Sequence, residues 1–331
     1  MKIVADNAIP FLKGVLEPYA RVEYLPGKTI ATADVRDADA LLVRTRTRCD
    51  AALLEGSSVK LIATATIGFD HIDTEYCRRH GIEVATAAGC NARGVLQYVA
   101  AALVRLSRVQ AWEPADKTLG IVGVGHVGSL VEAYARTWGF RVVACDPPRE
   151  EREPGGFLPL EEVARQAVIL TFHTPLDDTT RHMAGAKLFE RMKPGSILIN
   201  TSRGEVVDGQ ALRESGLQYV LDVREHEPDL DPPMLRNALL ATPHIAGYSA
   251  QGKANATALS VRTIGRYFGL PLGEWYPSNI APSRPRAISW QELCDTIDDR
   301  FDIAAESRRL KENPEKFETI RNEYRYREEY F

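Results

Sequence analysis

Cysteine is scarce in this sequence, and no two cysteines have the CxxC spacing. The 331-residue chain contains five: Cys49, Cys77, Cys90, Cys145 and Cys294. An odd number without paired spacing is a poor framework for disulfides and a poor zinc site. We therefore expect a protein of a reducing compartment that holds no metal.

Long apolar runs and a strong charge of one sign are also lacking. No run approaches the roughly 20 apolar residues that span a bilayer. The first residues, MKIVADNAIPFLK, reach charge and proline before a signal-type apolar core could form. Lys and Arg number 41 against 45 Asp and Glu, a net charge of −4, so no strong field draws the chain to nucleic acid or anionic lipid. These features predict a cytoplasmic protein that binds neither nucleic acid nor a membrane.

Short apolar runs are abundant and alternate with helical segments. Their residues are 2–5, 41–43, 61–66, 82–85, 119–122, 142–145, 168–171, 197–200, 219–222 and 239–242. Such runs are typical of parallel sheets covered on both faces. A long helical pattern, residues 91–111, separates the first four from the rest. The length suits two domains of roughly 150 residues each.

A glycine-rich turn follows the predicted strand 119–122. In Gly123-Val-Gly125-His-Val-Gly128, the first glycine allows a tight turn and the second lets the backbone approach a pyrophosphate. The third lets the following helix pack on the strand, with its N-terminus facing the phosphates. The motif alone is weak, but strand and helix stand on the correct sides of it.

An acid stands where the dinucleotide motif requires one. Asp146 ends the next predicted strand, at about the expected distance of 20 residues, and a carboxylate there accepts the ribose hydroxyls and favours NAD over NADP. Arg149 leaves the alternative open, because an arginine there could receive a 2′-phosphate. The sequence predicts an NAD site made by Gly123, Gly125, His126, Val127, Gly128 and Asp146.

Three polar residues follow later strands: Arg203 in NTSRGEVVD, Glu227 in LDVREHEP and His244 in ATPHIAGYSAQGK. Each alone has an ordinary explanation as a surface charge, a cap or a structural imidazole. Together they supply what oxidation of a 2-hydroxy acid needs. The histidine is a base near neutral pH, the carboxylate stabilises its imidazolium, and the arginine fork holds the substrate carboxylate.

NTSRGEVVD, DVREHEP and TPHIAG resemble the signature segments of the D-2-hydroxyacid dehydrogenase family. Further segments, VRTRT, TATIGFDHID, CDPPR and GYSAQGK among them, are similar to a branch of that family that acts on a phosphorylated sugar acid. The resemblance implies oxidation of 4-phospho-D-erythronate at C2, with NAD as the hydride acceptor. It also implies a homodimer, although longer relatives carry an additional C-terminal dimerisation domain and this chain stops at Phe331.

The resemblance also implies roles for individual residues. His244 is the acid and base, Glu227 its partner, and Arg203 orients the substrate. Nucleotide contacts fall on Asp146, Thr174, Thr201, Ser202, Arg203, Asp222 and Gly247. Substrate contacts fall on Thr45, Thr66 and Tyr248. The family's spacing before Pro228 selects Glu227 over its neighbours Glu225 and His226, and we expect His71 and His173 to be structural.

A candidate phosphate site stands near the N-terminus, in Arg44-Thr-Arg46-Thr-Arg48. In an extended segment the three arginines would share one face, and arginine forks with threonine hydroxyls suit a phosphate. An ordinary solvated loop is the alternative. The resemblance favours Arg44 and Thr45 as part of the substrate site.

The predicted fold is α/β, with two doubly wound parallel-sheet domains. A Rossmann-type NAD domain, residues 92–256, is inserted into a flavodoxin-like substrate domain formed by residues 1–91 and 257–285, and the active site is expected in the cleft. Residues 286–331 form a helical extension. There Ser289-Trp-Gln-Glu292 begins one helix with a stripe through Phe301 to Ala305, and Asn313-Pro314 begins a second. The charged, aromatic end, 321–331, is expected to be a solvated helix face or a subunit contact.

Two other functions stay open at this stage. One is oxidation or reduction of another acid by a related dehydrogenase, with 3-phosphoglycerate, glyoxylate or hydroxypyruvate as substrate. The other is an NAD-sensing binding protein of the corepressor type, on the same fold but without turnover.

Overall fold

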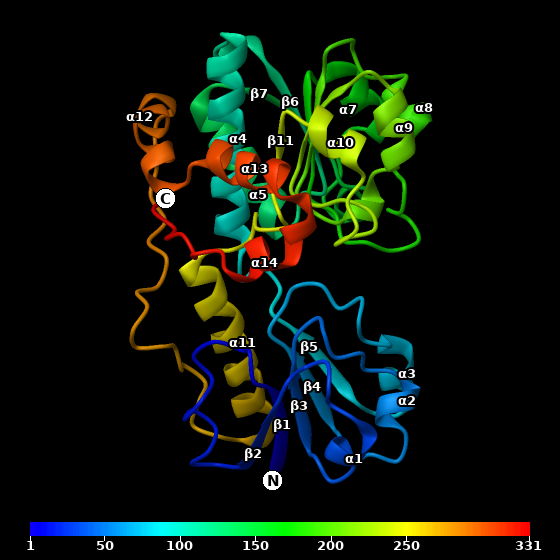
Figure 1. The fold of residues 1–331 in the computed structure, drawn as a ribbon, viewed down its shortest axis with the longest axis vertical. Helices are drawn as coiled ribbons and strands as arrows, with labels where there is room; N and C mark the ends of the chain where they lie inside the picture. Colours follow the sequence, from blue (N-terminus) through cyan, green and yellow to red (C-terminus); the bar gives the residue numbers. More distant parts are fainter. The chain divides into compact units, whose positions relative to one another are not determined.

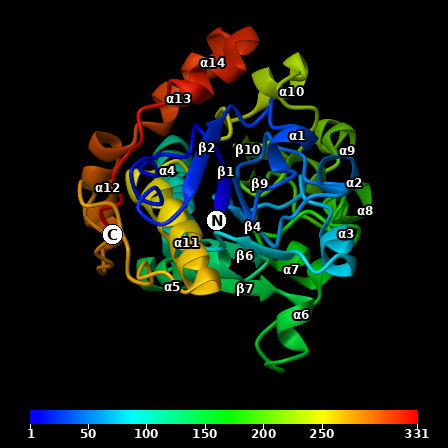
Figure 2. The same cartoon turned by 90° about the horizontal axis from the view of Figure 1, so that it is seen from below.

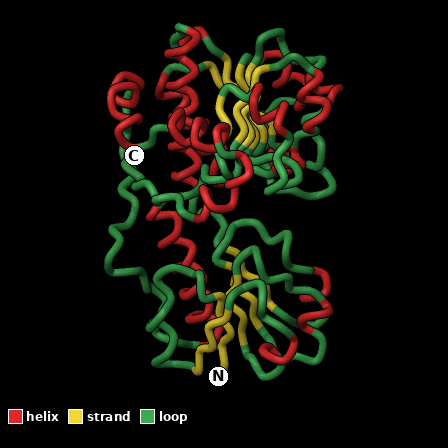
Figure 3. Tube along the Cα trace, in the orientation of Figure 1, coloured by secondary structure: helices red, strands yellow, loops and turns green.

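The computed structural model describes residues 1–331 and divides them into two compact units. Unit 1 comprises Met1–Asn91 and Ala250–Ser283, and unit 2 comprises Ala92–Ser249 and Arg284–Phe331. Each unit contains one parallel sheet, and Figure 3 shows the strands in these two separate groups. The predicted fold class of two doubly wound parallel sheets is confirmed.

Two predicted boundaries differ from this division. The expected change of domain at residues 256 and 257 falls inside helix α11 (Ala250–Phe268), which belongs whole to unit 1. A helix moves as one body, and α11 packs along strands β4 (Leu61–Thr64) and β5 (Glu83–Thr86). The C-terminal residues are not a separate extension, because they belong to unit 2.

Unit 1 has a five-stranded sheet in the order β2-β1-β3-β4-β5, the flavodoxin-like order. Its other strands are β1 (Lys2–Asp6), β2 (Arg21–Leu25) and β3 (Ala40–Val43). Its short helices are α1 (Thr32–Val35), α2 (Ala51–Leu54) and α3 (Thr74–Arg79). The edge strand β2 was not predicted, because its charged and half-buried residues lack an apolar run.

The sheet of unit 1 is covered on both faces, as its apolar strands require. Ile3 and Leu42 face the core that contains Val261 and Ile264 of α11. Neighbouring strand residues face the other core, with apolar residues of α1, α2 and α3. Figures 1 and 2 show α11 along one side of this sheet and the three short helices along the other.

Unit 2 has a six-stranded sheet in the order β11-β10-β9-β8-β6-β7. The strands are β6 (Thr118–Val122), β7 (Arg141–Cys145), β8 (Ile169–Phe172), β9 (Ile197–Asn200), β10 (Gln218–Leu221) and β11 (Leu240–Ala241). Strand order reverses between β6 and β8, and ligands of such sheets bind outside the carboxyl ends of strands at this point. The Gly123–Gly128 turn follows β6 directly.

The helices of unit 2 cover both faces of its sheet. The helices are α4 (Ala92–Gln110), α5 (His126–Trp138), α6 (Pro147–Glu150), α7 (Leu160–Gln166), α8 (Ala186–Phe189), α9 (Gly209–Glu214), α10 (Pro232–Asn237), α12 (Trp290–Arg300), α13 (Ile303–Glu312) and α14 (Phe317–Asn322). Short 3-10 turns are Pro114–Asp116, Gly204–Val206 and Pro314–Lys316. Leu119 and Ile121 of β6 face α4 and α5, whereas Val122 faces the core of α7 to α10. None of the helices is both long and apolar enough to cross a bilayer.

The C-terminal residues differ from the prediction in two ways. The first predicted helix is two helices, since α12 ends at Arg300 and Asp302 caps α13 by accepting a hydrogen bond from Ala305 N at 2.8 Å. Beyond α14 the chain is not a solvated helix face. Residues 323–331 form no helix, and four of their side chains are buried: Tyr324, Arg327, Glu329 and Phe331.

Candidate active site

The three glycines after β6 differ in the space around them. A Cβ atom on Gly128 would lie 2.0 Å from the Gly123 carbonyl oxygen, so only glycine lets α5 begin this close to the strand. Gly123 has φ +84° and lies against residues 173 and 174. A Cβ on Gly125 would meet nothing within 4 Å, which leaves room for a ligand at the N-terminus of α5. His126 and Val127 form the first turn of that helix.

The predicted ribose acid, Asp146, lies beside the glycine turn. Its carboxylate accepts hydrogen bonds from Val124 N at 2.7 Å and from Arg149 N at 3.0 Å. The Arg149 guanidinium donates to the Val124 carbonyl oxygen at 2.9 Å and pairs with Glu153. Arg149 therefore already has partners, and the carboxylate of Asp146 is held against the glycine turn.

The ends of β8 and β9 bring further predicted nucleotide residues to the same edge of the sheet. Thr174 lies against Gly123, and Thr201 Oγ1 lies 3.2 Å from His173 Nδ1. The other ring nitrogen of His173 lies 3.1 Å from Thr171 Oγ1. Burial lowers the pKa of His173 to about 3, so this imidazole is neutral at physiological pH and its role is structural.

Arg203 follows β9 in a turn that is held by one buried side chain. Asn200 donates to the Arg203 carbonyl oxygen at 2.8 Å, and its own oxygen accepts from Ser202 N and Ser202 Oγ. The Arg203 guanidinium donates to the Ser202 carbonyl oxygen. At Gly204 a Cβ would lie 2.0 Å from the carbonyl carbon of Arg224, so this turn packs directly on the segment that carries Glu227.

The predicted acid/base, His244, is in contact with its predicted partner, Glu227. His244 Nδ1 lies 2.8 Å from Glu227 Oε2. A carboxylate only accepts, so Nδ1 carries the proton and Nε2 is the basic nitrogen. Burial would raise the pKa of Glu227, but the hydrogen bond and charge of His244 and the charge of Arg224 outweigh burial and hold it below its ordinary value. Glu227 is therefore an anion that can stabilise an imidazolium on His244.

The loop that carries His244 is held by Asp222. This carboxylate accepts hydrogen bonds from Ile245 N, Ala246 N and Thr242 Oγ1, at 2.8, 2.8 and 2.7 Å. Tyr98 in α4 extends the network, since its hydroxyl lies 2.7 Å from Thr242 Oγ1. We predicted Asp222 as a nucleotide contact, but these bonds give it a second, positioning role.

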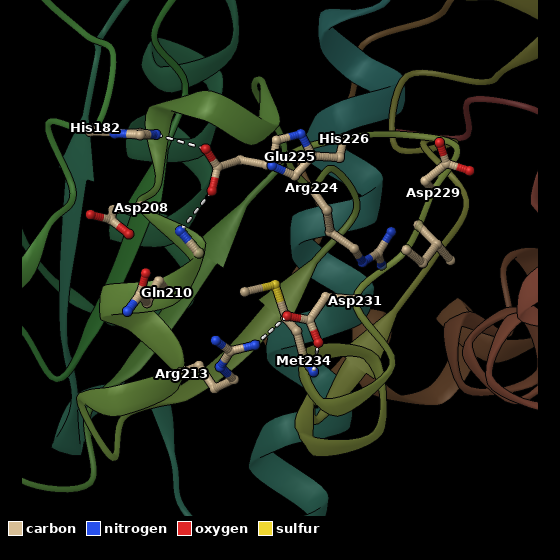
Figure 4. Close-up of a pocket in the computed structure, with 12 residues that line it drawn as sticks. His182, Asp208, Gln210, Arg213, Arg224, Glu225, His226, Asp229, Asp231 and Met234 are labelled. Carbon is tan, nitrogen blue, oxygen red and sulfur yellow. Dashed lines mark hydrogen bonds and ion pairs between the residues drawn. The ribbon is translucent and has the colours of Figure 1, made fainter.

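The neighbours of Glu227 face elsewhere. Glu225 lies 2.7 Å from His182 Nε2 and accepts a bond from Gly209 N. Figure 4 shows both bonds at a separate cavity of about 720 Å³, which Arg224 and His226 also line. Glu227, and not Glu225, contacts His244, as the family resemblance implied.

Tyr248, predicted to contact substrate, lies four residues after His244 beside Gly247. Arg321 in α14 donates from Nε to the Tyr248 hydroxyl at 3.0 Å and lies over its ring. The rings of Tyr324 and Tyr326 also contact Tyr248. The predicted substrate tyrosine is thus positioned by the C-terminal residues of its own unit.

The predicted phosphate segment lies in unit 1, and its geometry corrects the prediction. Residues 44–47 form a turn, closed by the bond from Thr47 N to the Arg44 carbonyl oxygen, so the arginines do not share one face of an extended strand. Arg44 pairs with the buried Asp6 at 3.2 Å, and Arg48 pairs with Asp50 at 2.7 Å. The turn replaces the strand because Asp6 accepts from Arg44 just where β3 ends.

Thr66 follows β4 in the same unit. Its hydroxyl lies 2.6 Å from Thr64 Oγ1 and donates to the Gly68 carbonyl oxygen. Thr64 also lies 3.4 Å from His71 Nε2. Thr66 and exposed Thr45 therefore both follow strands of unit 1 at their carboxyl ends.

Sequence reasoning did not identify the residues that hold the site in place. Asn200, Thr242 and Tyr98 give only weak local signals, since each stands inside an apolar run or a helix. Arg327 gives none, because it stands in a charged tail and its partners are distant in the sequence.

The comparisons with known proteins agree with this geometry. The NAD-binding domain of the D-isomer specific 2-hydroxyacid dehydrogenases matches residues 92–246. The erythronate-4-phosphate dehydrogenase of Bacteroides thetaiotaomicron is 45% identical over 340 residues, which cover 99% of this chain and 97% of that protein. The chain belongs to the erythronate-4-phosphate dehydrogenase family. The relative from Azotobacter vinelandii is also 45% identical, over 82% of this chain and 74% of that protein.

A solved structure supports the cofactor of this family member. The NAD⁺-bound 3-phosphoglycerate dehydrogenase of Entamoeba histolytica matches with a TM-score of 0.66 and 26% identity, covering 81% of this chain and 95% of that one. The chain is an NAD-dependent 2-hydroxyacid dehydrogenase, as its sequence predicted. The open space at Gly125 and the carboxylate of Asp146 fit a dinucleotide.

Proposed function

We propose that this dehydrogenase oxidises 4-phospho-D-erythronate to 2-oxo-3-hydroxy-4-phosphobutanoate, a step of pyridoxal 5′-phosphate biosynthesis. The contact between His244 and Glu227 carries the proposed chemistry, because it provides a base beside an anion that stabilises its protonated form. The names of the relatives, over almost the whole chain, support the substrate.

The proposed catalytic residues act on one proton and one carboxylate. Nε2 of His244 takes the proton of the C2 hydroxyl, while Glu227 holds the ring through Nδ1. Arg203 holds the substrate carboxylate with its planar fork and polarises the forming carbonyl. NAD, when bound, supplies the hydride acceptor.

The proposed nucleotide contacts surround the turn after β6. The glycine loop with His126 and Val127 binds the pyrophosphate, and Asp146 accepts the ribose hydroxyls. Further contacts come from residues after β8, β9 and β10 and from the His244 loop: Thr174, Thr201, Ser202, Arg203, Asp222 and Gly247. Their support is that all belong to unit 2 and that most follow its strands directly.

The proposed substrate contacts outside the catalytic set are Arg44, Thr45, Thr66 and Tyr248. Arg44 is part-exposed and already oriented by Asp6, so its fork needs little ordering to meet a phosphate. We also propose a cytoplasmic homodimer; the five free thiols agree with a reducing compartment. Light scattering of the purified protein tests the dimer.

Turnover of 4-phospho-D-erythronate and of 3-phosphoglycerate, measured side by side, tests the substrate. Purified protein receives NAD and a 2-oxo acid that reoxidises bound NADH, and mass spectrometry reads the products. We expect strong preference for the erythronate. Preference for 3-phosphoglycerate would contradict the substrate and keep the chemistry. Binding of NADH without turnover of either acid would favour an NAD-sensing protein.

The matched control for this experiment is His244→Asn. Loss of the base should lower kcat by about a thousandfold, while NADH binding, measured by fluorescence, persists. A variant that binds NADH and keeps wild-type turnover would contradict the role of His244.

A further inference from the structure

The C-terminal segment, Glu323–Phe331, is built into unit 2. It follows α14 past α4, as Figure 1 shows in red. Arg327 is 6% exposed and Glu329 is 9% exposed, whereas Arg325 between the buried side chains is exposed. A buried charge is costly unless hydrogen bonds compensate it. Both terminal nitrogens of Arg327 have such partners, whereas its buried Nε has none, so the partners of the terminal nitrogens indicate its role.

Those partners are the carbonyl groups of the histidine loop, Pro243–Tyr248. One terminal nitrogen of Arg327 donates to the carbonyl oxygens of Ile245 and Tyr248, each at 3.1 Å. The other donates to the carbonyl oxygen of Ala246. Three carbonyls of the loop that follows His244 therefore converge on one guanidinium.

The same guanidinium is itself fixed from three other sides. It donates to the Gly94 carbonyl oxygen in α4 at 2.7 Å and to the Tyr324 hydroxyl at 3.2 Å. It also lies 4.3 Å from the ring centre of Phe301. A planar fork with several donors can reach all of these acceptors, which a lysine ammonium cannot.

The loop is thus held between two buried charges. Asp222 accepts from the amides of Ile245 and Ala246, while Arg327 donates to the carbonyls of the same two residues. A second contact lies next to the loop, where Ser249 donates to Glu329 at 2.7 Å. The peptide between Ile245 and Ala246 is therefore held at both ends, its carbonyl by Arg327 and its amide by Asp222.

His244 needs such support because its backbone is strained. Its φ is +58°, in the left-handed region that residues other than glycine rarely adopt. Such a conformation persists only when the surroundings determine it. The ring of His244 meets Glu227 only if the backbone keeps this conformation.

We propose that Arg327 is a positioning residue for catalysis, which holds the histidine loop so that His244 meets Glu227 and the substrate proton. This inference rests on the proposed role of His244. It makes the C-terminal segment part of the catalytic machinery, although no residue of that segment follows a strand of the sheet.

Kinetics of Arg327→Ala and Arg327→Lys test the inference, with Arg325→Ala as the matched control. The control removes an arginine of the same charge that lies two positions from Arg327 and is exposed. In Arg327→Ala we expect kcat to fall by about a hundredfold, since small misplacement of a catalytic group costs this much. NADH affinity, which depends mainly on the glycine turn, should change far less. Arg327→Lys should retain only part of the activity, and Arg325→Ala all of it.

Added guanidinium ion distinguishes positioning from general destabilisation. Millimolar guanidinium chloride should restore part of the kcat of Arg327→Ala, because the ion can occupy the vacated site, and should not raise that of Arg325→Ala. Wild-type kcat in a folded Arg327→Ala would overturn the inference. So would a loss of kcat that matches the fraction of unfolded protein and that guanidinium does not restore. If Arg327→Ala does not fold, wild-type kcat in Arg327→Lys overturns it equally.

Histidine NMR separates this inference from the proposed function. In protein labelled with ¹⁵N-histidine, the His244 signals are assigned by their absence in His244→Asn. Their shifts should report the bond to Glu227 in the wild type and Arg325→Ala, and should move in Arg327→Ala. An unmoved His244 signal in Arg327→Ala would refute the positioning role, whatever acids the wild type oxidises. Failure of the wild type to oxidise any of the acids tested would refute only the proposed function.

Discussion

Two histidines of unit 2 show how the surroundings of one residue type decide its chemistry. His173 is half-buried between threonine hydroxyls with no carboxylate in contact, and desolvation of its ring lowers its pKa to about 3. His244 instead contacts the carboxylate of Glu227. A carboxylate in contact stabilises the imidazolium that forms when a ring accepts a proton, and of these two histidines only His244 has one.

The low pKa of His173 predicts a loss of stability in acid. Its folded pKa of about 3 lies below the ordinary value of 6.5, so the unfolded chain binds the proton first as pH falls. The contribution of neutral His173 is complete above about pH 6.5 and declines as pH falls towards 3. Relative to His173→Asn, the wild type should lose about 2 kcal/mol of unfolding free energy between pH 7 and pH 5.

Urea denaturation of both proteins at the two pH values measures this difference. Parallel loss of stability in wild type and variant would show that His173 is solvated enough to keep its ordinary pKa.

At the scale of elements, the turn from β6 into α5 separates packing from binding. Gly128→Ala would place a methyl group against the Gly123 carbonyl oxygen, which must shift the helix. Gly125→Ala adds its methyl group to open space. In this turn, Gly128 is therefore required for packing of the helix on the strand, whereas Gly125 is required only to leave space for a ligand.

The two alanine variants form a matched pair. Gly128→Ala should lower the unfolding free energy by about 1–3 kcal/mol, the usual range for overpacking, and should weaken NADH binding. Gly125→Ala should keep the wild-type thermal midpoint and still weaken NADH binding. Wild-type NADH affinity in Gly125→Ala would mean that the pyrophosphate does not approach this position.

At the scale of the whole molecule, the two units carry different parts of the proposed chemistry. Unit 2 carries the glycine turn, Arg203 and the contact between Glu227 and His244, while unit 1 carries Arg44. The C-terminal segment bonds to the rest of unit 2 at Gly94, Ser249 and Arg286. Each of these residues lies next to a point where the chain passes between the two units. The last residues therefore stabilise the part of the molecule that binds NAD.

A substitution in unit 1 should change substrate binding without changing NADH binding. Arg44→Ala should raise KM for 4-phospho-D-erythronate about tenfold to a hundredfold, the loss expected for a hydrogen bond between charged groups. The NADH dissociation constant should keep its wild-type value. Arg48→Ala is the control, since that side chain is 85% exposed and pairs with Asp50.

Steady-state kinetics and NADH fluorescence measure both quantities. Since Arg44→Ala also removes the partner of buried Asp6, its thermal midpoint is recorded with the kinetics. Unchanged KM in the folded variant would remove Arg44 from the substrate site.

Much of the proposed nucleotide site could be predicted because its signals are local. The glycine turn, Asp146 and the residues after each strand stand within a few positions of the element that places them. Parallel strands then bring their carboxyl ends to one edge, so a motif after each strand is enough to predict a shared site. The choice of Glu227 over Glu225 came from the family resemblance, and Glu227 contacts His244.

The remainder depended on partners that are distant in the sequence. The sequence from Arg44 to Arg48 predicts an extended segment, but it forms a turn in which Arg44 pairs with the buried Asp6 of β1. The last residues read as a solvated face, but Arg327 bonds to carbonyls 82 and 233 positions away.

The sequence by itself determined the fold class, the cofactor and the residues of the proposed catalytic contact, because short-range patterns specify strands, turns and the groups at their ends. Only the tertiary structure decided which buried charges hold those groups in place. Asp222 and Arg327 bind backbone amides and carbonyls, which every residue possesses, and such partners leave no pattern in a sequence.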